Sequence, residues 1–225
     1  MTGSSRTARR TRRTSGPAPR RPPRRPPRWV AWGAAPAAAL VLVWLLGCWA
    51  VLQHPRTDEP SRSDALLVLG PPDRTRMAEA QRLMDAGVAP VLVVADPGAG
   101  ELGDASGRVY YERARQVCAA EHAYEVICFR PDPSTTQGEA LQLRELGERR
   151  GWDHVSALTY RQHVARSRLI LGRCYTGELD VLAFDYPEVP RGLLREFAYQ
   201  SGGFVKAALT PGCDQQLPWR PKSLD

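Results

Sequence analysis

The stretch that decides the fold is Leu158-Thr-Tyr-Arg-Gln-His-Val-Ala-Arg-Ser-Arg168, which begins inside the apolar run Val155–Thr159 and continues into a helix-like pattern. The stretch Pro131-Asp-Pro-Ser-Thr-Thr-Gln-Gly-Glu-Ala140 has the same form, because it follows the apolar run Val126–Phe129 and opens a second helix-like pattern. A strand followed at once by a helix is the repeating unit of α/β folds. We therefore expect both stretches at the carboxyl ends of strands, where such sheets bind ligands.

Working outward, the same alternation continues on both sides of these stretches. The expected strands are short apolar runs suited to a sheet buried on both faces: Ala65–Leu69, Val91–Ala95, Val126–Phe129, Val155–Thr159 and Leu179–Phe184. The expected helices are 75–86, 108–120, 136–150, 162–173 and 191–209, the last with a Gly202-Gly203 pair that allows a kink or break. This order predicts a three-layer α/β/α Rossmann-like sandwich with a mainly parallel sheet.

The charge of the chain is concentrated at its amino end. The whole chain of 225 residues has a net charge of +7, yet residues 1–28 alone contain ten Arg and no acid, so the remainder carries about −3. A mildly acidic folded part argues against a nucleic-acid partner, which would need basic charge on the domain itself. The arm at 1–28 is rich in Arg and Pro and poor in apolar residues, and we expect it to be disordered and cytoplasmic.

One transmembrane helix is expected directly after this arm. Trp29–Leu52 contains no charged residue, and its 24 positions reach roughly 36 Å as a helix, enough to cross a hydrocarbon core of about 30 Å. Positive charge before the span keeps that side in the cytoplasm. The predicted organisation is a cytoplasmic arm at 1–28, a signal anchor at 29–52, a linker at 53–63 and an extracytoplasmic domain at 64–225, all of it at the cell membrane.

A lipoprotein interpretation of the same span stays open. Leu45-Leu46-Gly47-Cys48 is similar to a lipoprotein processing box, in which Cys48 is lipidated and everything before it is removed. The bulky Leu46 and the apolar residues that follow Cys48 favour an uncleaved anchor instead. Both interpretations place the domain outside the cytoplasm.

The cysteines agree with that location. Four of the five lie beyond the span, and none of them has Cys-x-x-Cys spacing, so a zinc or redox site is weakly supported. An even number of cysteines in an extracytoplasmic domain predicts disulfides. Of the three possible pairings we favour Cys118–Cys128 and Cys174–Cys213, which close the shorter loops. Four unpaired core cysteines are the alternative.

Several segments resemble the YdcF-like/SanA/ElyC proteins of bacterial envelopes over about residues 64–190. The matching segments are Leu69-Gly70, Arg74 and Arg76, Ser134 to Glu139, and Thr159 through His163 to Arg166. The chain departs from the family pattern at Gln137, Ala140 and Ala95-Asp96-Pro97. The resemblance implies a Rossmann-like fold and a role at the cell envelope, whereas the reaction of the family is itself poorly settled.

The loops at the predicted strand ends gather the residues that can carry chemistry. Those loops contain Gly70, Asp73 and Arg74, then Asp96, Gly98 and Gly100, then 132–139, then 159–166. Helix amino termini at such an edge favour an anion, so we expect Gly70, Arg74, Thr136, Thr159 and Arg166 to bind an anionic ligand. The chain has no Gly-x-Gly-x-x-Gly motif or P-loop, so no nucleotide cofactor is indicated. We expect no metal site either, because His163 has no second His at ligand spacing.

Each candidate also has a purely structural interpretation. Thr136 and Glu139 have the Thr-x-x-Glu spacing of a capping box, which closes the first turn of a helix. His163 lies near the start of an amphipathic helix, where a histidine is often a packing residue. Arg166, one turn further on, can project to the same side as His163. Arg168 and Arg173 on that helix are expected to be solvated.

Two classes of function follow from these residues. In an enzyme, His163 is a general acid or base, Glu139 orients it or carries a proton, and Arg166 with Arg74 holds an anionic group. In a binding protein or envelope-integrity factor, the same groups hold the ligand without changing it. We expect a single-pass envelope protein that binds or processes an anionic, phosphorylated cell-wall or lipid precursor. The oligomeric state is left open.

Overall fold

The computed structural model describes residues 28–95, 112–189 and 191–214. The arm at 1–27, the loop residues Asp96, Gly98 and Gly100, and the start of the helix expected at 108–120 lie outside the described residues. The chain falls into two compact units, Met1–Val41 and Leu42–Asp225.

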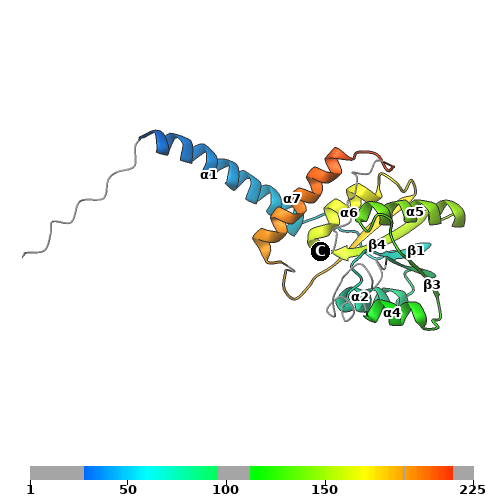
Figure 1. Ribbon diagram of the computed structural model, residues 1–225. Helices are drawn as coiled ribbons and strands as arrows, with labels where there is room; N and C mark the ends of the chain where they lie inside the picture. Colours follow the sequence, from blue (N-terminus) through cyan, green and yellow to red (C-terminus); the bar gives the residue numbers. More distant parts are fainter. Residues whose placement is uncertain (1–27, 96–111, 190, 215–225) are drawn as a thin grey trace, which may run out of the picture. The chain divides into compact units, whose positions relative to one another are not determined.

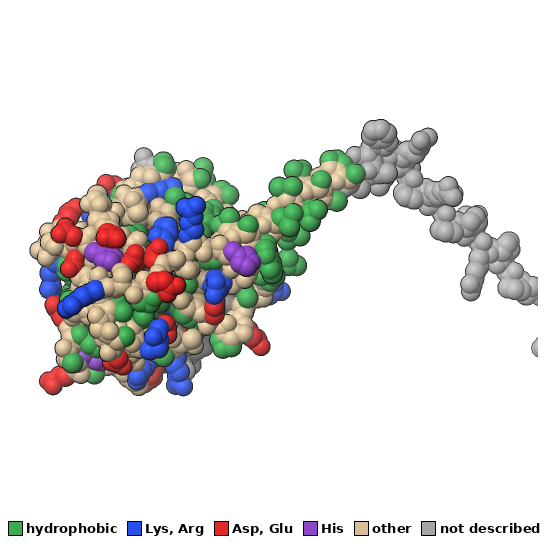
Figure 2. Space-filling view, turned by 180° about the vertical axis from the view of Figure 1, so that it is seen from behind, with side chains coloured by type: hydrophobic (Ala, Val, Ile, Leu, Met, Phe, Trp, Pro, Cys, Tyr) green, Lys and Arg blue, Asp and Glu red, His purple; other side chains and the backbone are tan. Residues whose placement is uncertain are grey.

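The described amino-terminal segment is helical. Helix α1 (Arg28–Cys48) passes directly into a π-helical turn, η1 (Trp49–Gln53). Within the described residues, Ala35–Gln53 is long and apolar enough to cross a membrane. Figure 2 shows hydrophobic side chains along this helix. The structure thus confirms one apolar helix of membrane-spanning length before the domain.

The second unit is built on a five-stranded, all-parallel sheet in the order β3-β2-β1-β4-β5 (Figure 1). The strands are β1 (Ala65–Val68), β2 (Val91–Ala95), β3 (Glu125–Phe129), β4 (His154–Tyr160) and β5 (Glu178–Phe184). Leu66 is paired with Leu92 of β2 on one side and with Ser156 of β4 on the other, so β1 lies in the centre. Each strand overlaps the run expected for it, and the predicted α/β fold with a parallel sheet is confirmed.

Helices cover both faces of this sheet. They are α2 (Arg74–Asp85), α4 (Glu112–Ala119), α5 (Thr136–Arg150), the short η2 (Arg161–His163), α6 (Val164–Leu171) and α7 (Leu193–Leu209). Because side chains alternate along a strand, Leu66 and Val68 pack with α2 and α4, whereas Ala65 and Leu67 pack with α5 and α6. Each strand needs apolar residues toward the helices on both faces of the sheet. This is why the strands appear in the sequence as continuous apolar runs.

Helix α7 runs unbroken through Gly202-Gly203, so no kink forms there. Its Phe197 joins Cys48 and Leu52 in a small apolar cluster that is separate from the two cores of the sheet. The ring of Trp44 meets Phe197 edge to face, with 6.5 Å between centroids. The last turns of α1 and η1 are thus packed against α7.

Two disulfide bonds cross-link the second unit. Cys118–Cys128 joins α4 to β3, and Cys174–Cys213 joins the segment after α6 to the segment after α7. Both are the pairings expected from the sequence. Cys48 is unpaired and buried.

Candidate functional site

The chain reverses its direction of travel across the sheet between β1 and β4. From β1 it adds β2 and β3 on one side, and then crosses over to β4 and β5 on the other. Parallel sheets bind ligands outside the carboxyl ends of the strands at such a reversal. Gly70 follows β1 at this point, Thr159 is the next-to-last residue of β4, and Thr136 opens α5. The structure thus brings the expected loops after β1, β3 and β4 to one edge.

Glu139 connects two of these loops. Its Oε1 accepts a hydrogen bond of 2.6 Å from the backbone N–H of Gly70. A Cβ on Gly70 would lie 2.9 Å from this oxygen, so only glycine allows the approach without displacement. The capping-box interpretation is wrong, because the N-cap of α5 is Thr135, whose side chain accepts from Gly138 N, and Glu139 bonds to Gly70 instead.

The carboxyl of Glu139 is buried, at 4 % exposed. Burial raises its pKa to about 7, although the Gly70 N–H, the charges of Arg76 and Arg166, and the Thr136 hydroxyl pull the pKa downward. Its second oxygen, Oε2, has no hydrogen-bond partner in the described part of the chain. A buried carboxyl that titrates near neutral pH is suited to proton transfer.

His163 is held by hydroxyl groups. Its Nδ1 lies 2.9 Å from Thr159 Oγ1 and 3.1 Å from Ser167 Oγ, and its Nε2 lies 3.5 Å from Thr136 Oγ1. The ring stacks on Tyr160, with 5.5 Å between centroids. When Nδ1 carries the proton and donates it to a hydroxyl, Nε2 turns its lone pair toward Thr136.

The surroundings of His163 disfavour the protonated imidazole. Burial lowers the pKa of His163 well below its usual value, and the positive charges of Arg166 and Arg76 lower it further. The expected role of Glu139 in orienting His163 is wrong. Thr159 and Ser167 hold the ring, while Glu139 bonds to Gly70.

The buried arginine of this edge is Arg76, which stands in the place expected for Arg74. Arg74, the first residue of α2, is exposed. Arg76 is fully buried, donates through Nη1 to Leu69 O, and has its guanidinium 5.6 Å from the Tyr160 ring centroid. Its Nε has no hydrogen-bond partner among the described residues. Unpaired buried polar atoms such as this one and Glu139 Oε2 are rare in folded proteins and often mark functional sites.

Arg166 is positioned from α7. Its Nε donates to Gln200 Oε1 at 2.9 Å, and its guanidinium lies 5.5 Å from the Tyr199 ring centroid. Gln200 in turn donates to Tyr160 Oη and to Glu196 Oε1, at 2.8 and 2.7 Å. This network links the end of β4 to α7 and fixes the side chain of Arg166.

A pocket of about 40 Å³ opens beside Arg166. It is lined by Thr135, Thr136, Gln137, Arg166, Ile170, Arg173, Cys174, Gly203, Lys206, Ala207, Thr210 and Gly212. This volume has room for about three waters, the size of a phosphate or carboxylate group. Glu139 and His163 do not line it. Thr136 does, and it connects the pocket to His163 Nε2.

The pocket is positively charged. Arg166, Arg173 and Lys206 line it, and its described lining contains no acid. Arg166 donates to the neutral Gln200, and Arg173 donates to the carbonyls of Ala207 and Thr210. Neither guanidinium forms an ion pair with a carboxylate among the described residues. The first turn of α5 adds its backbone N–H groups and the positive end of its dipole.

Sequence reasoning missed several residues of this site. Arg173 was expected to be solvated, but it lines the pocket. Arg168 was also expected to be solvated, but away from the pocket it forms an ion pair with Asp58 at 2.5 Å. Lys206 and Gln200 were not singled out, because each is an ordinary polar residue on a helix. The amphipathic pattern of α7, which buries Gln200 between apolar positions, was the one signal that pointed to them.

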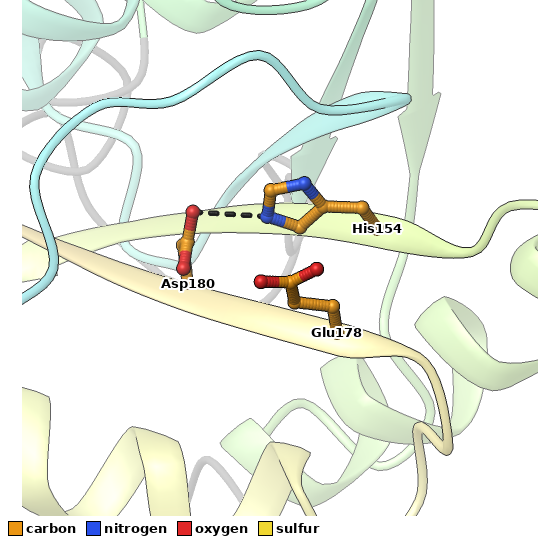
Figure 3. Close-up of side chains that lie close together, drawn as sticks. All are labelled: His154, Glu178 and Asp180. Atoms are coloured by element: carbon orange, nitrogen blue, oxygen red, sulfur yellow. Dashed lines mark hydrogen bonds and ion pairs between the residues drawn. The ribbon is translucent and has the colours of Figure 1, made fainter.

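A second group of titratable side chains lies at the opposite edge of the sheet. His154 and Glu178 begin β4 and β5, and Asp180 follows on β5 (Figure 3). Their ligand atoms lie within 4.8 Å of one another, although the spacing along the chain indicated no metal site. His154 Nε2 and Asp180 Oδ2 are 2.9 Å apart, and Ser61 Oγ donates to the same Oδ2. These bonds already join the strands and the preceding segment.

Comparisons with known proteins add no name to this site. No protein-family model, no curated protein and no solved structure matches the chain.

Proposed function

We propose that this chain is a membrane-anchored protein whose α/β domain binds an anionic, phosphorylated ligand at the carboxyl edge of its sheet. The pocket beside Arg166 carries the proposal. Three cationic side chains and the start of α5 surround a space the size of a phosphate group, and its described lining holds no carboxylate. Guanidinium groups that form no ion pair among the described residues, close to a helix amino terminus, favour phosphate through charge-assisted hydrogen bonds.

The anchoring part of the proposal rests on the amino-terminal helix. Ala35–Gln53 is apolar and long enough to span a bilayer, and ten Arg precede it in residues 1–28. Positive charge before a span retains that side in the cytoplasm, which places the domain outside. The two disulfides are stable in such an oxidising compartment. Uncleaved anchoring of this kind keeps Cys48 as an unmodified residue within the span.

The ligand class follows from the anchor and the pocket together. A phosphorylated cell-wall or lipid precursor carries the required anion and is found at this membrane. Membership in the YdcF-like envelope family is part of the proposal, because the segments at Gly70, Ser134 to Glu139 and Thr159 to Arg166 that carry the resemblance all contribute to this edge.

Processing of the ligand is the second candidate function. It is favoured by Glu139, whose pKa of about 7 lets the carboxyl gain or lose a proton near neutral pH. Neutral His163 adds a base that faces Thr136 at the pocket wall. The burial of both groups behind that wall favours binding as the first function.

The test is a calorimetric titration of inorganic phosphate into the full chain in neutral detergent micelles. We expect Arg166→Gln to weaken phosphate binding by about tenfold or more, because a hydrogen bond to a charged group contributes roughly 1.5–3 kcal/mol. The matched control is Arg149→Gln, which removes the same charge from the exposed end of α5. Equal weakening by both substitutions, or no phosphate binding to the parent, contradicts the proposal.

Processing is tested with the same protein and a soluble alkyl phosphomonoester, followed by phosphorus NMR. Conversion that is lost in Glu139→Gln supports an enzyme. An unchanged ester in the presence of protein that binds phosphate supports the binding function alone.

A further inference from the structure

Helix α7 presents an exposed apolar stripe. Leu194, Val205 and Leu209 are 64 %, 61 % and 67 % exposed. At 100° per residue these positions share one side of the helix with Ala198 and Gly202. The opposite side of α7 is buried through Phe197 and Gln200 against the domain and the end of α1. The stripe therefore has no partner among the described residues.

The stripe of α7 lies close to the carboxyl end of the apolar segment. Trp44 Nε1 donates to Ser201 Oγ at 3.0 Å, and Cys48 Sγ lies 3.6 Å from the same oxygen. Both residues belong to the apolar segment that ends at Gln53. At about 1.5 Å per residue they lie roughly 14 and 8 Å before its end, and the interfacial layer on each side of a bilayer is about 5–8 Å thick. Cys48 is thus near the inner limit of the interfacial layer and Trp44 is deeper, so a helix in contact with both lies at the boundary between headgroups and hydrocarbon.

The charges beside the stripe fit this depth. Arg195 and Lys206 lie along one side of the apolar positions of α7 and are exposed. An apolar stripe with cationic side chains beside it is typical of helices that lie in the plane of the interface, with their apolar side in the acyl boundary and their cations on anionic headgroups. Figure 1 shows α7 beside the last turns of α1, which the Trp44 and Cys48 contacts with Ser201 confirm.

We propose that α7 is a membrane-docking helix, which inserts the side chains of Leu194, Val205 and Leu209 into the outer surface of the bilayer that contains α1. The inference rests on the proposed membrane anchor and adds a second, interfacial contact to it. Lys206 neighbours Val205 and also lines the anion pocket. Docking therefore holds that pocket at the level of the lipid headgroups, where a lipid-borne phosphate reaches it directly.

The test uses nitroxide labels on the full chain in vesicles of phosphatidylcholine and phosphatidylglycerol. Val205→Cys and Leu194→Cys are each labelled in a Cys48→Ser background, and Arg149→Cys on α5 is the matched exposed control. Molecular oxygen concentrates in hydrocarbon and a neutral nickel chelate stays in water. We expect the ratio of oxygen to nickel collision rates to be severalfold higher at both α7 positions than at Arg149.

Three results overturn the inference in distinguishable ways. Failure of the chain to float with the vesicles refutes the membrane anchor and the docking together. Flotation with a ratio at Val205 and Leu194 equal to that at Arg149 refutes the docking alone. Labels shielded from both reagents, with spin–spin broadening between chains, show that a second copy covers the stripe.

Discussion

Glu139 and Gly70 lie 69 residues apart in sequence, and the carboxylate Oε1 of Glu139 accepts a 2.6 Å hydrogen bond from the Gly70 backbone N–H. The bond ties the first turn of α5 to the end of β1, the central strand. It leaves Oε2 buried without a partner in the described structure. One carboxyl thus fixes the geometry of the strand-end edge and keeps an oxygen available for a proton.

Replacement of Glu139 by Gln should change the pH dependence of stability. The carboxyl ionises near pH 4.5 in the unfolded chain and near pH 7 in the folded one. Between these values the unfolded chain has released a proton that the folded chain keeps, so a rise in pH favours unfolding. Across this window the parent should lose about 3 kcal/mol that Glu139→Gln does not lose.

Urea unfolding of the two proteins from pH 4.5 to pH 8, followed by near-ultraviolet circular dichroism, measures this difference. The titration of His163 acts in the opposite direction, since its lowered pKa removes stability as pH falls. It is common to both proteins and cancels in the comparison. Glu145→Gln on the exposed face of α5 is the control. A difference between parent and Glu139→Gln that stays constant with pH contradicts the account.

The two glycines of α7 should respond differently to alanine. A Cβ on Gly203 would lie 2.7 Å from Arg166 Cδ, whereas a Cβ on Gly202 meets nothing within 4 Å. Both substitutions gain about 0.5–1 kcal/mol of helix propensity. Gly203→Ala should also push Arg166 away from Gln200 and weaken phosphate binding, while Gly202→Ala leaves binding unchanged. Calorimetric titration of phosphate into the two alanine variants measures this difference. Equal phosphate affinity in both variants would show that the position of Arg166 is unimportant for binding.

The two disulfides should separate stability from binding. Cys174–Cys213 closes a loop with a sequence separation of 39, so its removal should lower the free energy of unfolding by about 4 kcal/mol. Cys118–Cys128 has a separation of 10, and its removal should lower that free energy by about 3 kcal/mol. Only Cys174–Cys213 borders the pocket, where Cys174 and Gly212 are part of the lining. We expect the double Cys→Ser variant without Cys174–Cys213 to bind phosphate more weakly, and the double variant without Cys118–Cys128 to bind it as the parent does. Both affinities are measured below the unfolding temperature. A larger loss of affinity on removing Cys118–Cys128 would place the anion elsewhere.

The orientation of the anchor is open to a reporter test. A phosphatase reporter that is active only outside the cytoplasm should be active when fused after Asp225 and inactive when fused at residue 28. The physical reason is the cost of moving the ten Arg of residues 1–28 across the bilayer. The reverse pattern of activity refutes an extracytoplasmic domain. Release of an acylated fragment that begins at Cys48 supports the lipoprotein alternative.

The strands and helices could be predicted from the sequence because each needs only local information. A central strand such as Ala65–Val68 has apolar residues for both layers, so it stands out as a continuous run. The contacts of the site depend on which strands become neighbours. The bond from Glu139 to Gly70 and the bond from Arg166 to Gln200 join residues 69 and 34 positions apart. No spacing in the sequence encodes them.

The sequence also did not show which of two nearby arginines is buried at the site. Arg74 and Arg76 both follow β1, and the resemblance did not distinguish them. Asp73 caps α2 by accepting from the N–H groups of Thr75 and Arg76, which sets the rotation of the helix. That rotation exposes Arg74 and buries Arg76 beside the rings of Tyr160 and Phe184.

The position of a bound oxyanion tests the central claim most directly. Crystals of the full chain grown from a lipid phase and soaked with tungstate, an oxyanion similar in shape to phosphate, reveal that position by anomalous scattering. We expect one strong peak between the side chains of Arg166 and Arg173, at the first turn of α5, and its loss in Arg166→Gln. A strong peak elsewhere on the domain with none at Arg166 would contradict the account.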